Sequence, residues 1–388
     1  MPNLLDKNKC VGCTACVSIC PQHCLEVLQD EFGFYYPKIK DSGKCVECHL
    51  CENVCPVKKT EANAYTIPKA YSAFSLSKDI QANSSSGGIF TELSLAVLQR
   101  NGIVYGAAYD ENWKVKHIVI DQAERMYMLQ GAKYSESFLD NTFLDIKEHL
   151  KSGRLVLFSG TPCQVAGLKS FLSDKYENLI CVDFVCHGIP SPMAWSEYIE
   201  SKKITKNCKP IRINQRSKNT GWSKYSYSCL IEYDDGTQYS KQNSDDLYMK
   251  LYCNDYISRE SCSTCNFKGY VRKSDITIGD FWGIWDIDPE MDNNLGTSLI
   301  LIHSPIGMQL FLSIVNQIKY KAVELEDVVK ENPSLLYASP QKRERADVLN
   351  MIKNKRFNEL WTLFPVNTPT VLPIWKKALR KIKRIIHL

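Results

Sequence analysis

The chain has 388 residues, of which 44% are hydrophobic, so it is long enough for two or three domains with sizeable cores. It contains no apolar run of about 18 residues, and we therefore expect no transmembrane helix. The formal net charge of +5 comes from 48 basic and 43 acidic residues, but six of the basic residues lie in 371–388, which contains no acid. Because the rest of the chain is close to neutral, its charge does not indicate a nucleic-acid partner.

Two cysteine runs near the N-terminus are the strongest motif in the sequence. Residues 10–21 and 45–56 each have the pattern C-x2-C-x2-C-x3-C-P, the spacing of bacterial ferredoxins with two 4Fe–4S clusters. Three thiolates on one loop hold one cluster, and the fourth points away and completes the other cluster. We expect one cluster on Cys10, Cys13, Cys16 and Cys55, and a second on Cys45, Cys48, Cys51 and Cys20.

Two other uses of these cysteines are disfavoured. We expect no signal peptide before the runs, and the chain is not a small secreted domain, which argues against a disulfide framework. Structural zinc favours isolated C-x2-C pairs, whereas both runs here are complete four-cysteine motifs. The large number of cysteines available for iron indicates a reducing, cytoplasmic location.

The sequence after the ferredoxin segment predicts a mixed α/β body. Residues 58–69 are typical of a linker. Hydrophobic patterns predict strands at 69–76, 103–109, 117–121, 154–159, 179–185, 211–214, 225–233, 237–239 and 298–303, and helices at 89–99, 138–150, 165–172 and 306–318. We expect an α+β protein with a ferredoxin-like domain at 1–60, body segments at 61–150 and 151–345, and a C-terminal region at 346–388.

Four further cysteines stand out in the body. Cys163 and Cys186 follow two buried strands at their carboxyl ends, where open α/β sheets bind ligands, and Cys262 and Cys265 form a C-x2-C pair. This set is suited to a third 4Fe–4S cluster, to structural zinc or to a redox-active dithiol. The other five, Cys24, Cys181, Cys208, Cys229 and Cys253, are expected to be small buried hydrophobic residues.

Two loops of the body have the composition of either turns or anion sites. The run 83–88 reads Asn-Ser-Ser-Ser-Gly-Gly and precedes a helix, so it supplies a helix cap or, through free N–H groups, a phosphate site. Lys133 lies in the second loop, 130–135, and either pairs with an anionic ligand or is simply solvated.

Taken in order, these motifs resemble the coenzyme F-420 hydrogenase/dehydrogenase beta-subunit family over roughly residues 1–320. The resemblance is carried by Ser85–Gly88, Gly131–Tyr134, Gly160–Gln164, Cys186–Gly188, the Cys262/Cys265 pair and Ser274–Gly283. Gly-Thr-Pro-Cys-Gln and Ser-Asp-Ile-Thr-x-Gly-Asp-Phe-Trp-Gly are specific as a set but not singly.

The resemblance implies a flavoprotein in which FAD lies beside a 4Fe–4S cluster. It places the third cluster on Cys163, Cys186, Cys262 and Cys265. It places FAD on Ser86, Gly87, Gly88, Lys133, Tyr134, Thr161, Pro162 and Gln164. No G-x-G-x-x-G motif follows a strand, so the expected FAD site is not of the Rossmann type.

The function that the resemblance implies is an oxidoreductase that relays electrons between ferredoxin-type clusters and FAD. Its expected partners are a redox protein or a reduced coenzyme, with a small-molecule substrate that the sequence does not identify. One alternative is an electron-transfer subunit that feeds a partner reductase and has no substrate site. Another is a non-catalytic iron–sulfur scaffold.

The C-terminal residues 374–388 predict a basic amphipathic helix. Apolar residues recur at helical spacing from Trp375 to Ile386, and cations fill the other face. This pattern is typical of a helix that lies on an anionic membrane surface, which would place the protein on the cytoplasmic face of the membrane. Docking of the helix on protein is the alternative.

Overall fold

The computed structural model describes residues 2–59, 67–173, 176–206 and 208–360. The predicted tail helix at 374–388 and most of the predicted linker lie outside these residues. Within the described ranges, each helix is either too short or too polar to cross a membrane.

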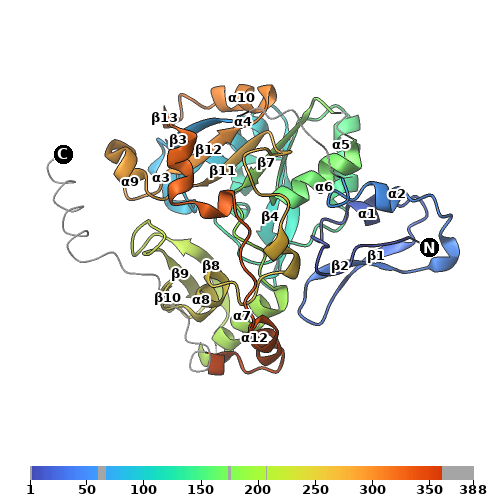
Figure 1. Cartoon of the computed structure of the whole chain (residues 1–388). Coiled ribbons are helices and arrows are strands. Elements are labelled where there is room, and N and C mark those ends of the chain that lie inside the picture. The colour runs from blue at the N-terminus through green and yellow to red at the C-terminus, as the bar shows by residue number, and fades with distance from the viewer. Residues whose placement is uncertain (1, 60–66, 174–175, 207, 361–388) are drawn as a thin grey trace.

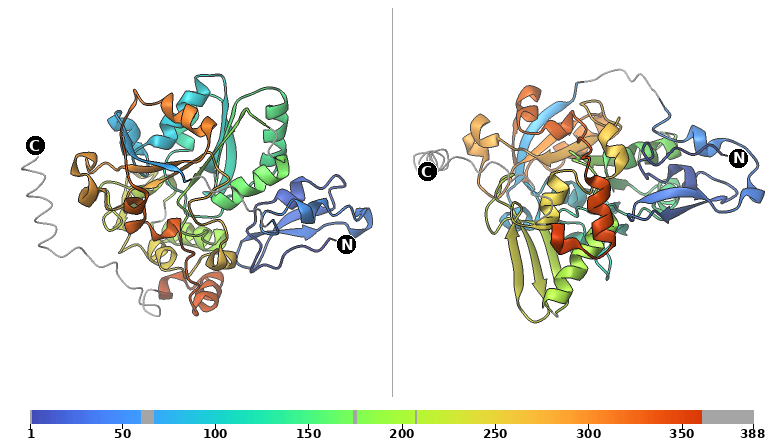
Figure 2. Two further views of the ribbon diagram at one scale, coloured as in Figure 1. Left: turned by 45° about the horizontal axis from the view of Figure 1, so that its top comes forward. Right: turned by 60° about the horizontal axis from the view of Figure 1, so that its bottom comes forward.

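The N-terminal ferredoxin domain has two short helices and one β-hairpin. The helices are α1 (Ala15–Ser18) and α2 (Leu50–Asn53), and the hairpin joins β1 (Leu25–Gln29) to β2 (Tyr35–Ile39) with antiparallel pairing. Each cysteine run enters its helix through a residue in the left-handed conformation, Thr14 with φ 60° and His49 with φ 55°. The two runs therefore have the same local backbone, and the domain lies on one side of a larger body (Figures 1 and 2).

The body is built on an eight-stranded mixed sheet with the order β13-β3-β12-β11-β7-β6-β4-β5. The pairs β4–β6, β6–β7 and β7–β11 are parallel, and the outer pairs are antiparallel. The strands are β3 (Lys69–Ser75), β4 (Ile103–Tyr109), β5 (Val115–Ile120), β6 (Val156–Ser159), β7 (Leu179–Phe184), β11 (Ile276–Asp280), β12 (Ser298–Ile302) and β13 (Ile318–Ala322).

Helices cover both faces of this sheet because successive side chains of a strand point to opposite sides. On one face, residues such as Val104 and Leu157 pack against α4 (Ile89–Leu98) and α10 (Pro305–Leu312). On the other face, their neighbours pack against α5 (Thr142–Lys151) and α6 (Pro162–Leu172). Smaller helices, α3 (Lys78–Asn83), α9 (Ile284–Ile287) and α11 (Leu325–Lys330), lie around the sheet.

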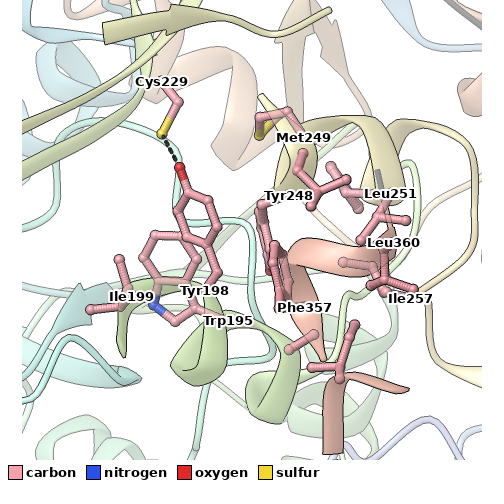
Figure 3. Close-up of a cluster of buried hydrophobic side chains, with 14 of the residues drawn as sticks. Trp195, Tyr198, Ile199, Cys229, Tyr248, Met249, Leu251, Ile257, Phe357 and Leu360 are labelled. Carbon is pink, nitrogen blue, oxygen red and sulfur yellow. Dashed lines mark hydrogen bonds between the residues drawn. The ribbon is translucent and has the colours of Figure 1, made fainter. Parts of the chain in front are cut away.

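A second core lies beside the large sheet. It joins the three-stranded sheet β10-β9-β8 to helices α7, α8 and α12, and Trp195, Tyr198 and Tyr248 form its aromatic centre (Figure 3). The strands are β8 (Pro210–Ser217), β9 (Ser228–Tyr233) and β10 (Gln238–Gln242), and the helices are α7 (Pro192–Lys206), α8 (Leu247–Cys253) and α12 (Arg345–Lys353).

The ferredoxin domain shares both cores with the body. Phe34 and Tyr36 of its hairpin belong to the second core, and Cys13, Ala15 and Val54 belong to the core under α5 and α6. Cluster ligation alone does not define this domain, since its inner side is also held by apolar packing.

The strands of the large sheet confirm most of the predicted elements, whereas one predicted helix is wrong in part. The helix predicted at 306–318 ends at Leu312, and Ile318 begins the edge strand β13. Apolar periodicity continues across the break because Ile314 and Ile318 are buried on the same core as the helix. Continuous burial therefore imitated a longer helix.

Candidate functional site

The second ferredoxin cysteine set lines a pocket at the outer end of the domain. The pocket is bounded by Cys20, Cys45, Cys48 and Cys51, together with residues such as Pro2, Pro21 and Leu50. The fourth cysteine of the first run thus meets the first three of the second run, as crossed ligation requires. Cys48 is exposed, and the other three thiols are partly buried.

The complementary set, Cys10, Cys13, Cys16 and Cys55, lies at the inner end of the domain. Burial, together with the neighbouring Cys10 and Cys55, raises the pKa of the Cys16 thiol to about 12. Burial also raises the pKa of Cys13 well above its usual value. Burial therefore keeps the Cys13 and Cys16 thiols protonated in the absence of metal, and coordination to iron would release their protons.

The third cysteine set converges from three separate segments of the body. Cys163 is in the first turn of α6, directly after β6, and Cys186 follows β7. Cys262 lies in a short 3-10 turn and Cys265 at its end. The electrostatic neighbours of Cys163 are the other three thiols, and burial raises the pKa of Cys262 to about 12.

The chemistry of these three sets is that of soft sulfur donors. Within the described ranges, no three or more His, Cys, Asp or Glu side chains converge closely enough to hold a single metal ion. A four-iron cluster makes a different demand, since each thiolate binds its own iron at a separate corner. The second set lines one pocket, and the thiols of the first and third sets are electrostatic neighbours of one another, which is compatible with that demand.

The predicted loop Ser86–Gly88 packs directly against the large sheet. The Gly87 N–H donates to Ser298 Oγ over 3.0 Å, and a Cβ at Gly87 would lie 2.5 Å from the Ala73 carbonyl oxygen. Gly88 caps α4 with φ +88°. The two glycines are therefore accounted for by close packing and by the cap.

The predicted residue Lys133 is partly buried and has no acidic neighbour that stabilises its charge among the described residues. Its Nζ donates to the carbonyl oxygens of Gln130 (2.8 Å) and Gly131 (3.2 Å). Burial lowers the pKa of Lys133 to about 7. An anionic ligand would restore the charged form.

Tyr134 links the same loop to two other parts of the body. Its OH accepts a hydrogen bond from Arg216 Nη1 over 3.1 Å, and its ring lies 4.8 Å from the ring of Tyr252. Tyr252 also contacts the His187 ring at 5.2 Å and interacts electrostatically with Cys186. Tyr252 therefore lies between the third cysteine set and the Tyr134 loop.

The predicted residues Thr161, Pro162 and Gln164 form the start of α6. Thr161 Oγ1 accepts from the Gln164 N–H, and Gln164 Oε1 accepts from the Thr161 N–H over 2.9 Å, which is a capping box. Pro162 occupies the first turn, where its missing N–H costs nothing. Thr161 Oγ1 also lies 3.1 Å from Cys163 Sγ. These residues hold the cysteine in place.

A group of cationic and aromatic residues beside the Ser85–Gly88 loop was not predicted from the sequence. Arg216 binds Asp280 through two hydrogen bonds (2.7 and 3.0 Å) and also contacts the Ser85 carbonyl. Lys218 Nζ donates to the carbonyls of Gln81, Ser86 and Leu295, and burial lowers its pKa to about 7. The available signal was the spacing of Arg216, near the end of β8, and Lys218, directly after that strand.

Several N–H donors in this region lack partners. Gln81 Nε2, Gln215 Nε2, Arg216 Nε and Trp222 Nε1 are buried and have no hydrogen-bond partner among the described residues. The Trp222 ring stacks on Trp282 at 5.0 Å. Buried donors without partners are costly, so a ligand rich in acceptors would repair this site.

The five remaining cysteines depart in part from expectation. Cys24, Cys181 and Cys229 are buried as predicted, Cys208 is partly buried, and Cys253 is exposed. The expectation was wrong for Cys253 because it lies one turn after Lys250, the other residue of α8 that is not buried.

Comparison with known families agrees with the motifs. Residues 9–59 match the 4Fe-4S dicluster domain, and residues 153–328 match the C terminus of the beta subunit in the coenzyme F420 hydrogenase/dehydrogenase family. Residues 153–328 thus resemble the C-terminal part of this beta subunit, and the N-terminal residues 9–59 form a dicluster ferredoxin domain. The chain is therefore an iron–sulfur protein related to an oxidoreductase family. No curated protein matches it significantly.

Among the solved structures that match, one covers most of the chain. It is a chain of the F420-reducing [NiFe] hydrogenase complex from Methanosarcina barkeri, with 18% sequence identity and a TM-score of 0.48. The match covers 80% of the present chain and 99% of the other.

Proposed function

We propose that the protein is an iron–sulfur flavoprotein oxidoreductase that relays electrons between two ferredoxin-type clusters, a third cluster and FAD. Cys10, Cys13, Cys16 and Cys55 hold the first cluster, and Cys20, Cys45, Cys48 and Cys51 hold the second. Cys163, Cys186, Cys262 and Cys265 hold the third. When bound, the clusters carry single electrons and the flavin exchanges between one-electron and two-electron transfer.

The observation that carries this proposal is the position of the third cysteine set. It lies between the inner end of the ferredoxin domain and the Tyr134–Arg216 region, to which Tyr252 connects it. Zinc at this position would interrupt the relay, whereas iron–sulfur ligation continues it.

The residues around Ser85–Gly88 fit an anionic, acceptor-rich cofactor such as FAD. Arg216, Lys218 and Lys133 supply positive charge, and the partnerless donors of Gln215 and Trp222 supply hydrogen bonds. Trp222, Trp282 and Tyr134 supply aromatic surface. Gly87, Gly88, Thr161, Pro162 and Gln164 shape the site by holding the loop and the Cys163 turn, and Ser86 offers its carbonyl to Lys218.

The proposal includes the division of the chain into domains, its location and its partners. The ferredoxin domain comprises residues 1–60, the body 61–150 and 151–345, and the C-terminal region 346–388 with the basic segment 374–388, for which the sequence predicts a helix. We place the protein in the cytoplasm, with that helix on an anionic membrane surface. Its partners are a redox protein or a reduced coenzyme.

A second candidate is an electron-transfer subunit that feeds a partner reductase and has no substrate site of its own. The exposed Cys48 edge of the second site favours it, because an exposed ligand loop can exchange electrons with another protein. An FAD site that is closed to small molecules would select this alternative.

The flavin is tested by anaerobic purification and chromatographic identification of the released cofactor. We expect about one FAD per chain, as one site implies. The Lys218→Met variant should lose most of it, whereas Lys151→Met, which removes an exposed lysine paired with Glu148, should retain it. Protein that neither contains nor takes up FAD would refute the flavoprotein.

A further inference from the structure

The first ferredoxin cysteine loop lies against the body, and the second does not. We propose that Arg259 and Glu136 are positioning residues that hold the Cys10–Cys16 loop against the Cys262 segment. The first site then neighbours the third, and the second site is the outer one. This inference rests on the proposed function and adds the order of its sites.

The carbonyl of Cys10 makes the closest link between the two sites. It accepts hydrogen bonds from Arg259 Nε over 2.9 Å and from Ser261 Oγ over 3.0 Å. Ser261 directly precedes Cys262 in the chain. A ligand of the first site and a ligand of the third are therefore joined through one hydrogen bond and a peptide bond.

An independent contact joins the same two sites through α6. Helix α1 lies beside α6 (Figure 1), and a Cβ at Gly167 would be 2.8 Å from Cys13 Cβ and 2.9 Å from its Sγ. Gly167 lies one helical turn after Cys163, on the same face of the helix. Only glycine lets Cys13 approach α6 this closely.

The buried Arg259–Glu136 ion pair fixes the position of the Cys10–Cys16 loop. Arg259 Nη1 donates to Glu136 Oε1 over 2.6 Å, and their side chains are 1% and 6% exposed. Both also bind Tyr35, since its N–H donates to Glu136 and its carbonyl accepts from Arg259 Nη2. Gly12 leaves room for the pair, because a Cβ there would lie 2.6 Å from Glu136 Oε1.

The second cysteine loop has the opposite surroundings. Val46 is 62% exposed and Leu50 43% exposed on either side of the exposed Cys48. Ser170 Oγ on α6 donates to the Val54 carbonyl over 2.6 Å, and Val54 precedes Cys55, which is a first-site ligand. That contact therefore supports the same order.

The order is tested by electron paramagnetic resonance of the reduced protein. A Cys48→Ala/Cys51→Ala variant lacks the outer cluster, and magnetic coupling between the two remaining clusters should persist. A Cys13→Ala/Cys16→Ala variant lacks the inner cluster, and the coupling should disappear. The reverse result, with coupling lost on removal of the outer cluster, would overturn the order.

The positioning role is tested by hydrogen–deuterium exchange of the purified protein. In the Arg259→Met variant, hydrogen exchange should become faster at residues 10–16 and stay unchanged at 45–51. The midpoint potential of the inner cluster should also shift downward, because a cation beside it is lost. Lys353→Gln breaks an exposed ion pair between the body and Glu31 of the ferredoxin domain, and it should change neither the exchange at 10–16 nor the midpoint potential. Unchanged exchange at 10–16 in Arg259→Met would refute the role.

A milder change guards against misfolding of that variant. Ser261→Ala removes only one of the two hydrogen bonds to Cys10 and should weaken the coupling while exchange at 45–51 stays normal. Exchange also separates this inference from the proposed function. Each cluster holds about four irons, so a chain without the third cluster would hold about eight instead of twelve. If residues 10–16 were still protected from exchange in such a protein, the third cluster would be overturned but the docking of the first loop would stand.

Discussion

The two cysteine runs have the same spacing and the same local backbone but opposite surroundings. Thr14 and His49 both adopt the left-handed conformation before a four-residue helix. Cys13, however, is 7% exposed within the core under α6, whereas its counterpart Cys48 is exposed to solvent. The motif fixes how three thiols are presented, and the body decides which set is enclosed.

This difference has consequences for chemistry. Hydrogen bonds, net charge and solvent exposure set the potential of an iron–sulfur cluster. The inner set lies beside the Arg259–Glu136 pair and includes the buried Cys13, whereas the outer set includes the exposed Cys48. Two clusters with the same ligands should therefore have distinct potentials and distinct reactivity.

Single ligand removal should give the largest effect and the sharpest contrast. Cys13→Ala and Cys48→Ala should each lose about four irons. Only Cys13→Ala should also lower the midpoint of thermal unfolding of the body, because Cys13 packs on α6. Iron analysis and calorimetry check this expectation, and equal midpoints for the two variants would contradict the inner placement.

Chelation should separate the two sites in time. A chelator has access to the exposed Cys48 side of the outer pocket first, so about four irons should leave before the rest. The decay of visible absorbance, followed with iron release, measures the two phases. A single phase for all the iron would mean that the sites are equally accessible.

A single methyl group should loosen the inner contact. Gly167→Ala places a Cβ against Cys13 and should cost about 1–3 kcal/mol of unfolding free energy. The control is Gly43→Ala in the outer part of the domain, where a Cβ would meet only Asp41 Oδ1 at 3.4 Å, and it should change stability by about 0.5 kcal/mol or less. Denaturant unfolding of both variants makes the comparison.

The same contrast applies to the buried Lys133 and the exposed Lys151 of the body. The effect predicted from it, on the pH dependence of FAD affinity, is the smallest. Burial lowers the pKa of Lys133 to about 7, so its charge is lost as the pH rises through 7. If FAD binds the charged form, its affinity should fall by at most about tenfold per pH unit above that value. The dependence should weaken in Lys133→Met and stay intact in Lys151→Met. Equilibrium titrations between pH 6 and 9 decide the matter.

Much of this architecture could be predicted from the sequence. The cysteine spacing implies the crossed ligand sets, and apolar strands followed by Cys163 and Cys186 place both residues at one sheet edge. The match of residues 153–328 also confirms the family resemblance.

Other features depend on contacts between distant segments. Arg259, Glu136 and Tyr35 are far apart in the chain, and no local pattern indicates that they meet. Arg216 and Lys218 resemble ordinary solvated cations at the end of a strand until burial shows that they are enclosed. Conversely, Gly87 and Gly88, which resembled a phosphate loop, are also required by packing on the sheet.

The most direct test of the account is the iron and sulfide content of anaerobically purified protein, with the Cys262→Ala/Cys265→Ala variant measured beside it. The account predicts about twelve irons per chain for the wild type and about eight for the variant, since each cluster holds four. Cys208→Ala, whose thiol belongs to none of the three sets, should keep twelve. About eight irons in both the wild type and the Cys262/Cys265 variant would contradict the third cluster, and with it the relay from the ferredoxin domain into the body.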